Sequence, residues 1–419
     1  MSIPARCFLV AFLFIILLLL LGRRLRLSRV NRIHAPPSLL SSAYCNAPGI
    51  HANCLFTRSM CYNVSSATWE LSNLPFPNWG GVSLRARGEI FITDPLYSAC
   101  NELLIPKLSK LPPSEQIHWV TGTSVMSCIW VNFFGHIFIE MMLPAWMAWR
   151  KLADHFYILD KNVSYVLDNR CRANTAASSF SLLSSRPILQ LAELVNETRL
   201  RKKSHTCFEQ LVIGYRLQSS LQFPHNVAHL ESRDVVRYRD YIKTLHGLPL
   251  QVNMSTGECI ALLLQRNYSR RILDKSEKEI VTMLRERTLC TVKIATFDGI
   301  SILEQVRLVA SATIFIHVSG SGSHHFIWLS DGAASLTLAH PHLGLHVIGN
   351  GGIGGGGMPL NDLLCWKHPT VLCVTAATRA IKSHYSSDVE VDTYSFSIAL
   401  DMIKVWQHRG KFDPRDPSE

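Results

Sequence analysis

Residues 259–264 read CIALLL, residues 276–287 SEKEIVTMLRER, residues 291–295 TVKIA, residues 301–310 SILEQVRLVA and residues 312–318 ATIFIHV. The short apolar runs predict buried strands, and the longer runs, with apolar residues every three or four positions, predict helices. Strand, helix, strand, helix, strand at this spacing is typical of a doubly wound parallel sheet. This stretch therefore predicts an α/β fold.

Both predicted helices carry a start signal. Ser276 with Glu279, and Ser301 with Glu304, have the spacing of a capping box, in which the serine and glutamate side chains bind free N–H groups. We expect each helix to begin at its serine. A further strand is predicted at residues 334–338.

The chain before this stretch has weaker patterning. Residues 165–167 and 211–213 predict strands, and residues 133–155 predict a long apolar helix that Pro144 kinks. Prolines and scattered cysteines in the earlier part predict a stem. The predicted boundaries are residues 1–22 for an N-terminal signal-anchor helix, 23–88 for the stem, 89–250 for a first domain and 251–410 for a second domain.

Residues 7–22 (CFLVAFLFIILLLLLG) are apolar throughout. Sixteen residues is shorter than the roughly 20 that cross an average bilayer, and this length suits a thin early-secretory membrane. No small-x-small cleavage site follows, so we predict an uncleaved, single-pass signal-anchor; a cleaved signal peptide is the alternative. The net charge of +11 owes much to five arginines after this run, so it argues little for nucleic acid.

The orientation of this anchor rests on opposing signals. The arginines after it would place the rest of the chain in the cytosol by the positive-inside rule. Twelve cysteines suit an oxidising compartment better, and N-x-S/T sequons suit a glycoprotein. We predict a lumenal body in the Golgi or endoplasmic reticulum membrane. The sequons are at Asn63, Asn162, Asn196, Asn253 and Asn267.

Two loops are predicted to meet at one site, because ligands of doubly wound sheets bind at the carboxyl ends of the strands. The first loop, residues 265–275, carries Arg266, Arg270 and Arg271. Guanidinium groups match phosphate oxygens in pairs, which favours a diphosphate clamp; a solvated basic loop is the alternative.

The second loop follows residues 312–318 and reads Ser-Gly-Ser-Gly. Glycines let the backbone approach a ligand, and the N–H groups at a helix start favour an anion. An ordinary strand-to-helix turn is the alternative. The residues proposed to bind an anion here are Ser319, Gly320, Ser321, Gly322, Ser323 and His325.

His136 stands at the start of the long apolar helix, with Glu140 one turn on. A packed histidine is the plain interpretation, and an oriented imidazole is the functional one. The chain has no D-x-D sequence, and the alternating Asp388, Glu390 and Asp392 favour a solvated strand over a metal site. We therefore predict no metal.

Three segments in order resemble glycosyltransferase family 61, which includes plant xylan-modifying transferases and animal protein O-linked GlcNAc transferases. Residues 132–144 (NFFGHIFIEMMLP) resemble the family's N-[FY]-x-H…LP segment. Residues 265–273 (QRNYSRRIL) resemble its R-x-x-S-R-x-[IL] loop, and residues 304–333 resemble its E-Q…H-G-A-G-L-T-H…L-P-P-G-A block. The order and spacing agree over roughly residues 115–340.

The last segment departs from the family pattern in its side chains. Ser319 stands where the family usually has histidine, Ser321 replaces alanine and Ser323 replaces leucine. Ser330 and Asp331 replace a pair of prolines. The chain thus resembles a diverged member of the family.

The resemblance implies a GT-B-like fold: two Rossmann-like domains, each with a parallel sheet, facing one another across a cleft. It implies an inverting transfer from a nucleotide sugar, with UDP as the expected nucleotide, to a glycan or protein hydroxyl, without a further cofactor. His136 is the candidate general base. A fold retained for binding alone, and a hydrolase with paired carboxylates, are the alternatives.

Overall fold

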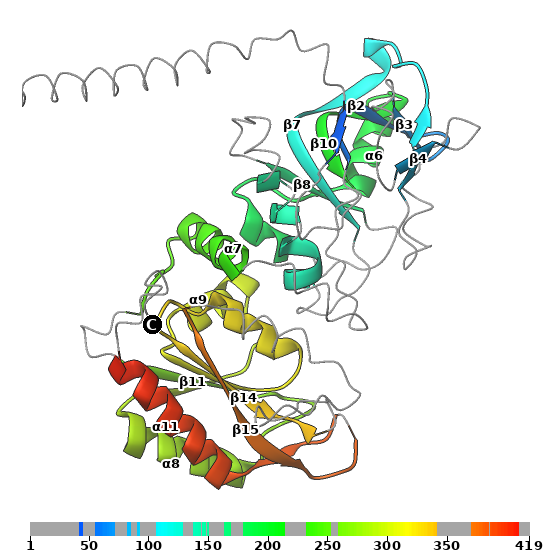
Figure 1. The fold of residues 1–419 in the computed structure, drawn as a ribbon. Helices are drawn as coiled ribbons and strands as arrows, with labels where there is room; N and C mark the ends of the chain where they lie inside the picture. The colour runs from blue at the N-terminus through cyan, green and yellow to red at the C-terminus, as the bar shows by residue number, and fades with distance from the viewer. Residues whose placement is uncertain are drawn as a thin grey trace, which may run out of the picture.

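The structure is a computed structural model that forms two β-sheets in separate halves of the molecule (Figure 1). The first sheet has the strand order β6-β3-β2-β10-β7-β8-β9, and the second has the order β12-β11-β13-β14-β15-β16. The placement of the following residues is described: 42–44, 55–71, 82–84, 90–92, 106–128, 137–143, 145–147, 149–150, 163–168, 179–213, 232–252, 259–341, 370–384 and 386–409.

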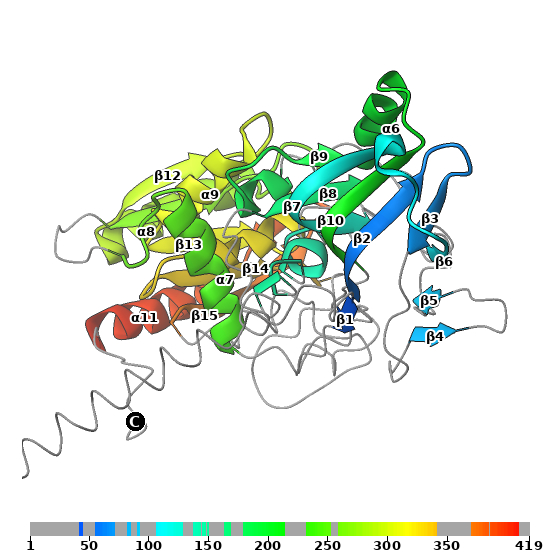
Figure 2. The ribbon, with the colours of Figure 1, turned by 90° about the horizontal axis from the view of Figure 1, so that it is seen from above.

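The first sheet is mixed, with four parallel strands at one side (Figure 2). β10 pairs parallel with β7, β7 with β8 and β8 with β9, whereas β2 runs antiparallel to both β10 and β3. β1 joins the edge of β2. The strands are β1 (Ser42–Tyr44), β2 (Leu55–Asn63), β3 (Thr68–Leu71), β6 (Pro106–Leu108), β7 (Ile117–Cys128), β8 (Ser164–Asp168), β9 (Leu189–Gln190) and β10 (His205–Ile213).

The fully parallel first sheet expected from the sequence is therefore wrong in part. β1, β2 and β3 come from the stretch predicted as a stem, and the disulfide Cys61–Cys207 ties β2 to β10. The strands β8 and β10 include the two runs predicted as strands. The outer strands β4 (Val82–Leu84) and β5 (Ile90–Ile92) form a separate antiparallel pair.

The predicted long apolar helix begins differently from expectation. Its described part starts as a π-helix, η3 (Ile137–Met142), with helical residues following to 150. Because Pro144 has no N–H to donate to the carbonyl of residue 140, the α-helical hydrogen bond cannot form at this point. The other helical segments of this half are η2 (Ser114–Gln116), η4 (Ser181–Leu183) and α6 (Leu191–Leu200).

The second sheet is parallel from β12 to β15, as the sequence predicts, and only β16 is antiparallel. α9 covers one face and α8 with α11 covers the other (Figure 1). Its elements are β11 (Ile260–Leu264), α8 (Asp274–Thr288), β12 (Thr291–Ala295), α9 (Ile302–Ala310), β13 (Ile314–Val318), η7 (Ser321–Trp328), β14 (Ala334–Ala339), β15 (Leu372–Ala380), β16 (Val389–Val391) and α11 (Thr393–Arg409).

One of the two expected capping boxes forms in its serine half, while the Glu304 carboxylate pairs with Arg307. The Ser301 hydroxyl accepts a hydrogen bond from the Glu304 N–H at 3.2 Å. The Ser276 box is wrong: α8 begins at Asp274, and the buried Ser276 hydroxyl accepts from the Val391 N–H at 3.1 Å. The Ser276 hydroxyl, which the local pattern assigns to a helix cap, is therefore bonded to the distant strand β16 instead.

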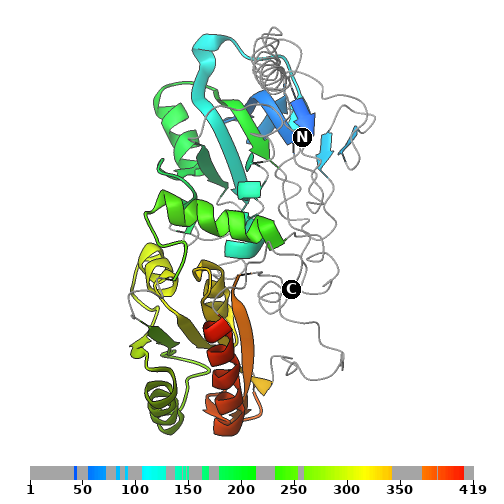
Figure 3. The same cartoon turned by 60° about the vertical axis from the view of Figure 1, so that its left-hand side comes forward.

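A single hydrophobic cluster joins the two halves, with α7 (Ser232–Leu245) lying between them (Figure 3). The cluster contains Tyr165 of the first sheet, Phe138 of η3, Tyr238 of α7 and Trp328 of η7, all buried. The Phe138 ring lies edge-on to Trp328, with centroids 5.4 Å apart. Both sheets are rich in parallel pairs and suit Rossmann-like domains; the GT-B arrangement stays a prediction.

The predicted anchor, residues 7–22, lies outside the described residues. Among the residues described, no helix combines the length and the apolar character that crossing a bilayer requires.

Candidate functional site

The candidate site lies at the carboxyl ends of β11 and β13, where the chain connections of the second sheet run in opposite directions. From β11 the chain crosses to β12 on one side, and from β12 it returns to β13 on the other. The loops after β11 and β13 thus flank the crevice at which ligands of doubly wound sheets bind. The two loops expected to meet do so.

Gln265 holds the first loop in shape. Its side-chain oxygen accepts from the N–H groups of Arg266 and Ile272, both at 3.0 Å. Its amide group donates to the Ile272 carbonyl at 3.0 Å and to Glu277 at 2.7 Å. Four hydrogen bonds from one side chain close the loop at both ends, so its arginines are presented from a rigid base.

Two guanidinium groups of this loop lie against Gly320. A Cβ atom placed on Gly320 would stand 2.7 Å from Nη1 of Arg270 and 2.8 Å from Nη1 of Arg266. Gly320 also has φ +143°, a conformation that favours glycine. Only glycine allows this approach. Arg270 donates from Nη1 to the Ser319 carbonyl at 3.3 Å.

The charges at this point are not balanced within the loop. Burial, and then the neighbouring Arg270, lower the pKa of Arg266 to about 10, while Asp298 acts in the opposite sense. Nη1 of Arg266 is buried and has no hydrogen-bond partner among the described residues. Two adjacent cations with an unused buried donor favour the binding of an anion.

A cavity of about 140 Å³ opens beside Arg266. Loops after β11, β12 and β13 all contribute to its wall, so it is open to a ligand at the carboxyl end of the sheet. Its lining residues are Leu264, Gln265, Arg266, Asn267, Tyr268, Ser269, Phe297, Asp298, Gln305, Val318, Gly322 and His325.

His325 lies buried in this wall. Burial lowers its pKa to about 3, so the ring is neutral near neutral pH. Nε2 lies 2.9 Å from the side-chain oxygen of Gln305, and Nδ1 lies 3.1 Å from the Gly322 carbonyl. A neutral imidazole has one N–H, so it donates to only one of these two acceptors.

Gln305 fixes which atom faces the histidine. Its amide group donates to the carbonyls of Phe297 and Ile300 at 3.3 and 3.1 Å. The amide oxygen is therefore the atom presented to His325, which favours the proton on Nε2. The Phe297 ring lies 4.5 Å from the imidazole, centroid to centroid.

The serines of the second loop serve the loop itself. The Ser319 hydroxyl donates to the Leu338 carbonyl and accepts from the His340 N–H, both at 3.0 Å. The Ser323 hydroxyl donates to the Gly320 carbonyl. Ser321 begins the helix η7, as the predicted turn requires.

Arg271 points to a different partner. It bonds Asp388 through its backbone N–H, Nε and Nη2, at 3.0, 3.1 and 2.8 Å. The cavity lining contains Arg266 but not Arg271. Its predicted place in the clamp is therefore the least supported of the three arginines.

His136 lies outside the described residues, but the segment directly after it reaches the site. Phe138 is fully buried, and its ring lies edge-on to His325 with centroids 5.3 Å apart. Phe138, two residues after His136, thus brings the first half of the molecule into contact with the wall of the cavity.

The sequence analysis missed Gln265, Phe297, Asp298 and Gln305. The rule that located the arginines also covers Phe297 and Asp298, since both follow β12. The roles of the two glutamines depend on backbone groups in other loops, so no local pattern reveals them. No group of three metal-ligating side chains occurs in the part of the chain that the structure describes.

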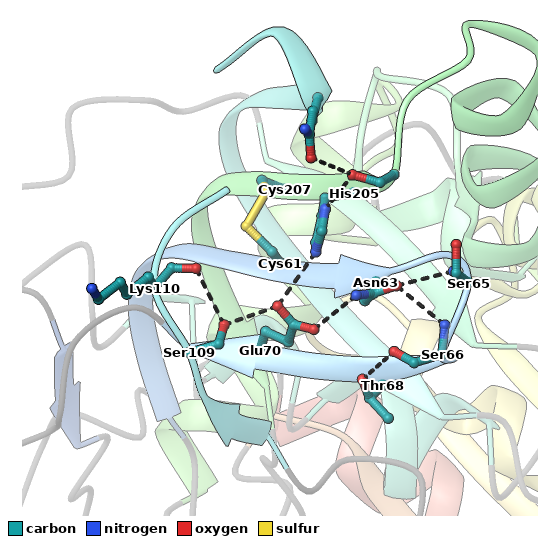
Figure 4. A network of polar contacts seen from close by, with 12 residues as sticks. Cys61, Asn63, Ser65, Ser66, Thr68, Glu70, Ser109, Lys110, His205 and Cys207 are labelled. Carbon is teal, nitrogen blue, oxygen red and sulfur yellow. Dashed lines mark hydrogen bonds and ion pairs between the residues drawn. A yellow bond between two sulfur atoms is a disulfide. The ribbon is translucent and has the colours of Figure 1, made fainter. Parts of the chain in front are cut away.

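A second polar network lies on the first sheet (Figure 4). Glu70 lies 3.3 Å from Nε2 of His205 and accepts from Asn63 and Ser109, both at 2.9 Å. The partners come from β2, β3, β10 and the chain after β6. Each Glu70 oxygen has a partner, so this network braces the sheet.

Comparison with known proteins supports one family. Residues 134–336 match the family model described as Glycosyltransferase 61. This stretch contains η3, both loops of the cavity and all of η7, and the match confirms the resemblance found in the motifs. A search of the curated proteins found no match.

Proposed function

We propose that this chain, whose residues 134–336 form a glycosyltransferase 61 domain, transfers a sugar from a nucleotide sugar to a hydroxyl of a glycan or protein. Glycosyltransferase activity in general follows from the family. UDP as the nucleotide, the acceptor and inversion at the anomeric carbon are our proposals. The observation that carries the donor site is Nη1 of Arg266, which is buried beside Arg270 and has no hydrogen-bond partner among the described residues.

The donor diphosphate would lie between the two loops of the cavity. Arg266 and Arg270 supply the charge, and N–H groups in the first turn of η7 add donors that have no partner within a helix. A hydrogen bond to a charged group contributes about 1.5–3 kcal/mol. Arg271, held by Asp388, would add positive potential rather than a direct contact.

The acceptor hydroxyl would be activated from the other half of the molecule. As its oxygen attacks the anomeric carbon, its proton passes to His136 and the bond from that carbon to the diphosphate oxygen breaks. The arginines stabilise the negative charge that develops on the leaving diphosphate. The contact of Phe138 with His325 supports this arrangement, because Phe138 follows His136 by two residues and packs against the wall of the cavity.

We further propose that the body of the protein lies in the lumen of the Golgi or endoplasmic reticulum, held by residues 7–22. The disulfides Cys61–Cys207 and Cys259–Cys290 support an oxidising compartment. Asn196 is exposed on α6 and so is an accessible sequon. Endoglycosidase treatment of protein from a eukaryotic host should increase its mobility; unchanged mobility would contradict the lumenal orientation.

The decisive experiment measures binding and transfer with the full-length chain. UDP and a panel of UDP-sugars should raise the melting temperature, because they bind the native state only. One of these sugars should then appear on an acceptor with inverted configuration. Binding without transfer to any acceptor in a glycan and protein panel would favour the inactive binding protein. No binding of any nucleotide sugar would refute the proposal.

A further inference from the structure

A carboxylate stands at the rim of the cavity, and the anion-binding role of the arginines does not use it. Asp298 lies on the loop between β12 and α9, lines the cavity and is exposed. Its Oδ2 accepts a hydrogen bond from Nδ2 of Asn267 at 2.7 Å. Its Oδ1 accepts none from the residues that the structure describes, so one acceptor is oriented and available.

Asn267 ties this carboxylate to the arginine loop. It directly follows Arg266 in the chain, and both residues line the cavity. Asp298 is also near enough to Arg266 to raise its pKa against the effect of burial. The cavity therefore presents the Arg266 guanidinium group together with a hydrogen-bond acceptor that Asn267 orients.

This pairing of groups matches the chemistry of a nucleoside diphosphate. β11, α8 and β12 form a βαβ unit whose two strands are parallel neighbours. In doubly wound sheets the diphosphate lies at the loop after the first strand of such a unit. An acidic side chain after the second strand accepts hydrogen bonds from ribose hydroxyls. Arg266 and Asp298 occupy these two positions.

We propose that Asp298 accepts a hydrogen bond from a ribose hydroxyl of the donor nucleotide, and that Asn267 is the positioning residue that orients its carboxylate. The inference rests on the proposed function, since it assumes that a nucleoside diphosphate occupies the cavity. It adds a role in recognition: the site distinguishes a ribonucleotide from a deoxyribonucleotide and from free pyrophosphate.

A plainer role for Asp298 is to balance the charge of Arg266. The two roles differ in what they do to ligands without ribose. A counter-ion acts on every anion that Arg266 binds, so its loss would change pyrophosphate and UDP affinity alike. A ribose contact affects only ligands that carry the hydroxyl.

The test compares UDP, 2′-deoxy-UDP, 3′-deoxy-UDP and pyrophosphate by calorimetry on the full-length chain. The wild type should bind UDP about 10- to 100-fold more tightly than at least one deoxy analogue. Asp298→Asn should weaken UDP binding by that factor, remove the preference and leave pyrophosphate affinity within about twofold. Asn267→Ala should weaken UDP binding by a smaller factor of about 3–10.

Two control variants keep the result clear. Glu279→Gln removes an exposed carboxylate on α8, away from the cavity, and should change no affinity. Ser269→Ala removes the Asn267 sequon but keeps the asparagine, so it separates any effect of glycosylation from the loss of the hydrogen bond. Melting temperatures of all variants establish that they are folded.

The possible failures are distinguishable. If neither UDP nor pyrophosphate binds the wild type, the proposed function fails. Equal affinity of the wild type for UDP and both deoxy analogues would overturn the ribose contact while leaving the donor site intact. Equal losses for UDP and pyrophosphate in Asp298→Asn would overturn it too, and would assign Asp298 to charge balance.

Discussion

The two ends of η7 each face a pair of basic side chains, yet the pairs differ in their partners. At its start, Arg266 and Arg270 lie against Gly320. Just beyond its end, Arg239 and Lys243 of α7 are completely buried against residues 329–331. Both places are basic, and the cavity pair is half-buried, so residue type alone does not separate them.

Carboxylates of the protein neutralise Arg239 on α7, although its Nη2 makes no hydrogen bond of regular geometry with the described residues. Nη2 of Arg239 lies 2.7 Å from Asp240 and 2.6 Å from Asp331, and Nη1 donates to the Leu329 carbonyl at 3.1 Å. Nζ of Lys243 donates to the Ser330 hydroxyl at 2.8 Å. Ser330 and Asp331 replace two prolines of the family pattern, and these contacts supply a structural reason for the replacement.

The pair in the cavity differs at Arg266, and this difference separates the two roles. Nη1 of Arg270 donates to the Ser319 carbonyl. Nη1 of Arg266 is buried without a partner among the described residues. A buried cation that is paired with carboxylates of the chain has a structural role, whereas a cation with a spare buried donor favours an external anion.

The largest expected effect is on the reaction rate and concerns His136. It precedes by two residues Phe138, whose ring contacts His325 and Trp328 of η7. If His136 is the general base, His136→Ala should lower kcat by about 10²–10⁴-fold and leave UDP affinity unchanged, because we propose that the other half of the molecule holds the donor. Steady-state rates and calorimetry measure the two quantities. Near-normal kcat, or a large fall in melting temperature, would instead support a packed histidine.

Breaking the α7 pair should affect stability and not binding. Asp331→Ala removes one of two carboxylates from the fully buried Arg239 and should lower the free energy of unfolding by about 3 kcal/mol. Asp388→Ala opens the exposed pair with Arg271 and should cost roughly 1 kcal/mol or less. Denaturant titration compares the variants, and equal costs would remove the distinction between the two kinds of pair.

Breaking the cavity pair should have the opposite pattern. Arg266→Ala should weaken UDP binding by about 1.5–3 kcal/mol and leave stability unchanged or slightly higher, since two like charges are separated. Arg270→Ala should behave similarly. Arg271→Ala tests whether the third guanidinium belongs to the clamp: affinity close to wild type would confine the clamp to two arginines. Unchanged UDP affinity in Arg266→Ala would show that its loop is only solvated.

The smallest effect on stability at neutral pH is that of Lys243 in the α7 pair, and this effect depends on pH. Burial, and then Arg239, lower the pKa of Lys243 from 10.5 to about 7. Between pH 7 and 10.5 the unfolded chain holds a proton on Lys243 that the folded protein has released, so the free energy of unfolding rises with pH. Below about pH 7 both states hold this proton, so the cost of burying the charge is constant. Lys243→Met should stabilise the protein by about 1 kcal/mol at pH 7.

The stability advantage of Lys243→Met over wild type should fall as the pH rises from 7 toward 10 and then reverse, because the wild type gains roughly 1 kcal/mol per pH unit in this window. Denaturant titrations of both proteins at pH 7, 8, 9 and 10 measure this difference. A difference that stays constant would show that Lys243 does not titrate in this window.

The sequence by itself determined strands β11 to β14 of the second sheet, but not β15 and β16. Strands β11, β12, β13 and β14 lie within one residue or two of their predicted bounds, because buried parallel strands appear as short apolar runs between amphipathic helices. The meeting of the two loops followed from the same pattern, since parallel strands bring their carboxyl ends to one edge. The family match confirmed the motifs on which the function rests.

Only the tertiary structure decided what depends on distant partners. β2 has its place in the first sheet because it pairs with β10, well over a hundred residues away. The alternation of polar and apolar residues within β2 does not predict this pairing. Arg271 turns to Asp388 and Ser276 serves Val391, although nearby residues suggested a clamp and a cap. A polar side chain bonds the partner that folding brings within about 3 Å, and sequence spacing does not specify that distance.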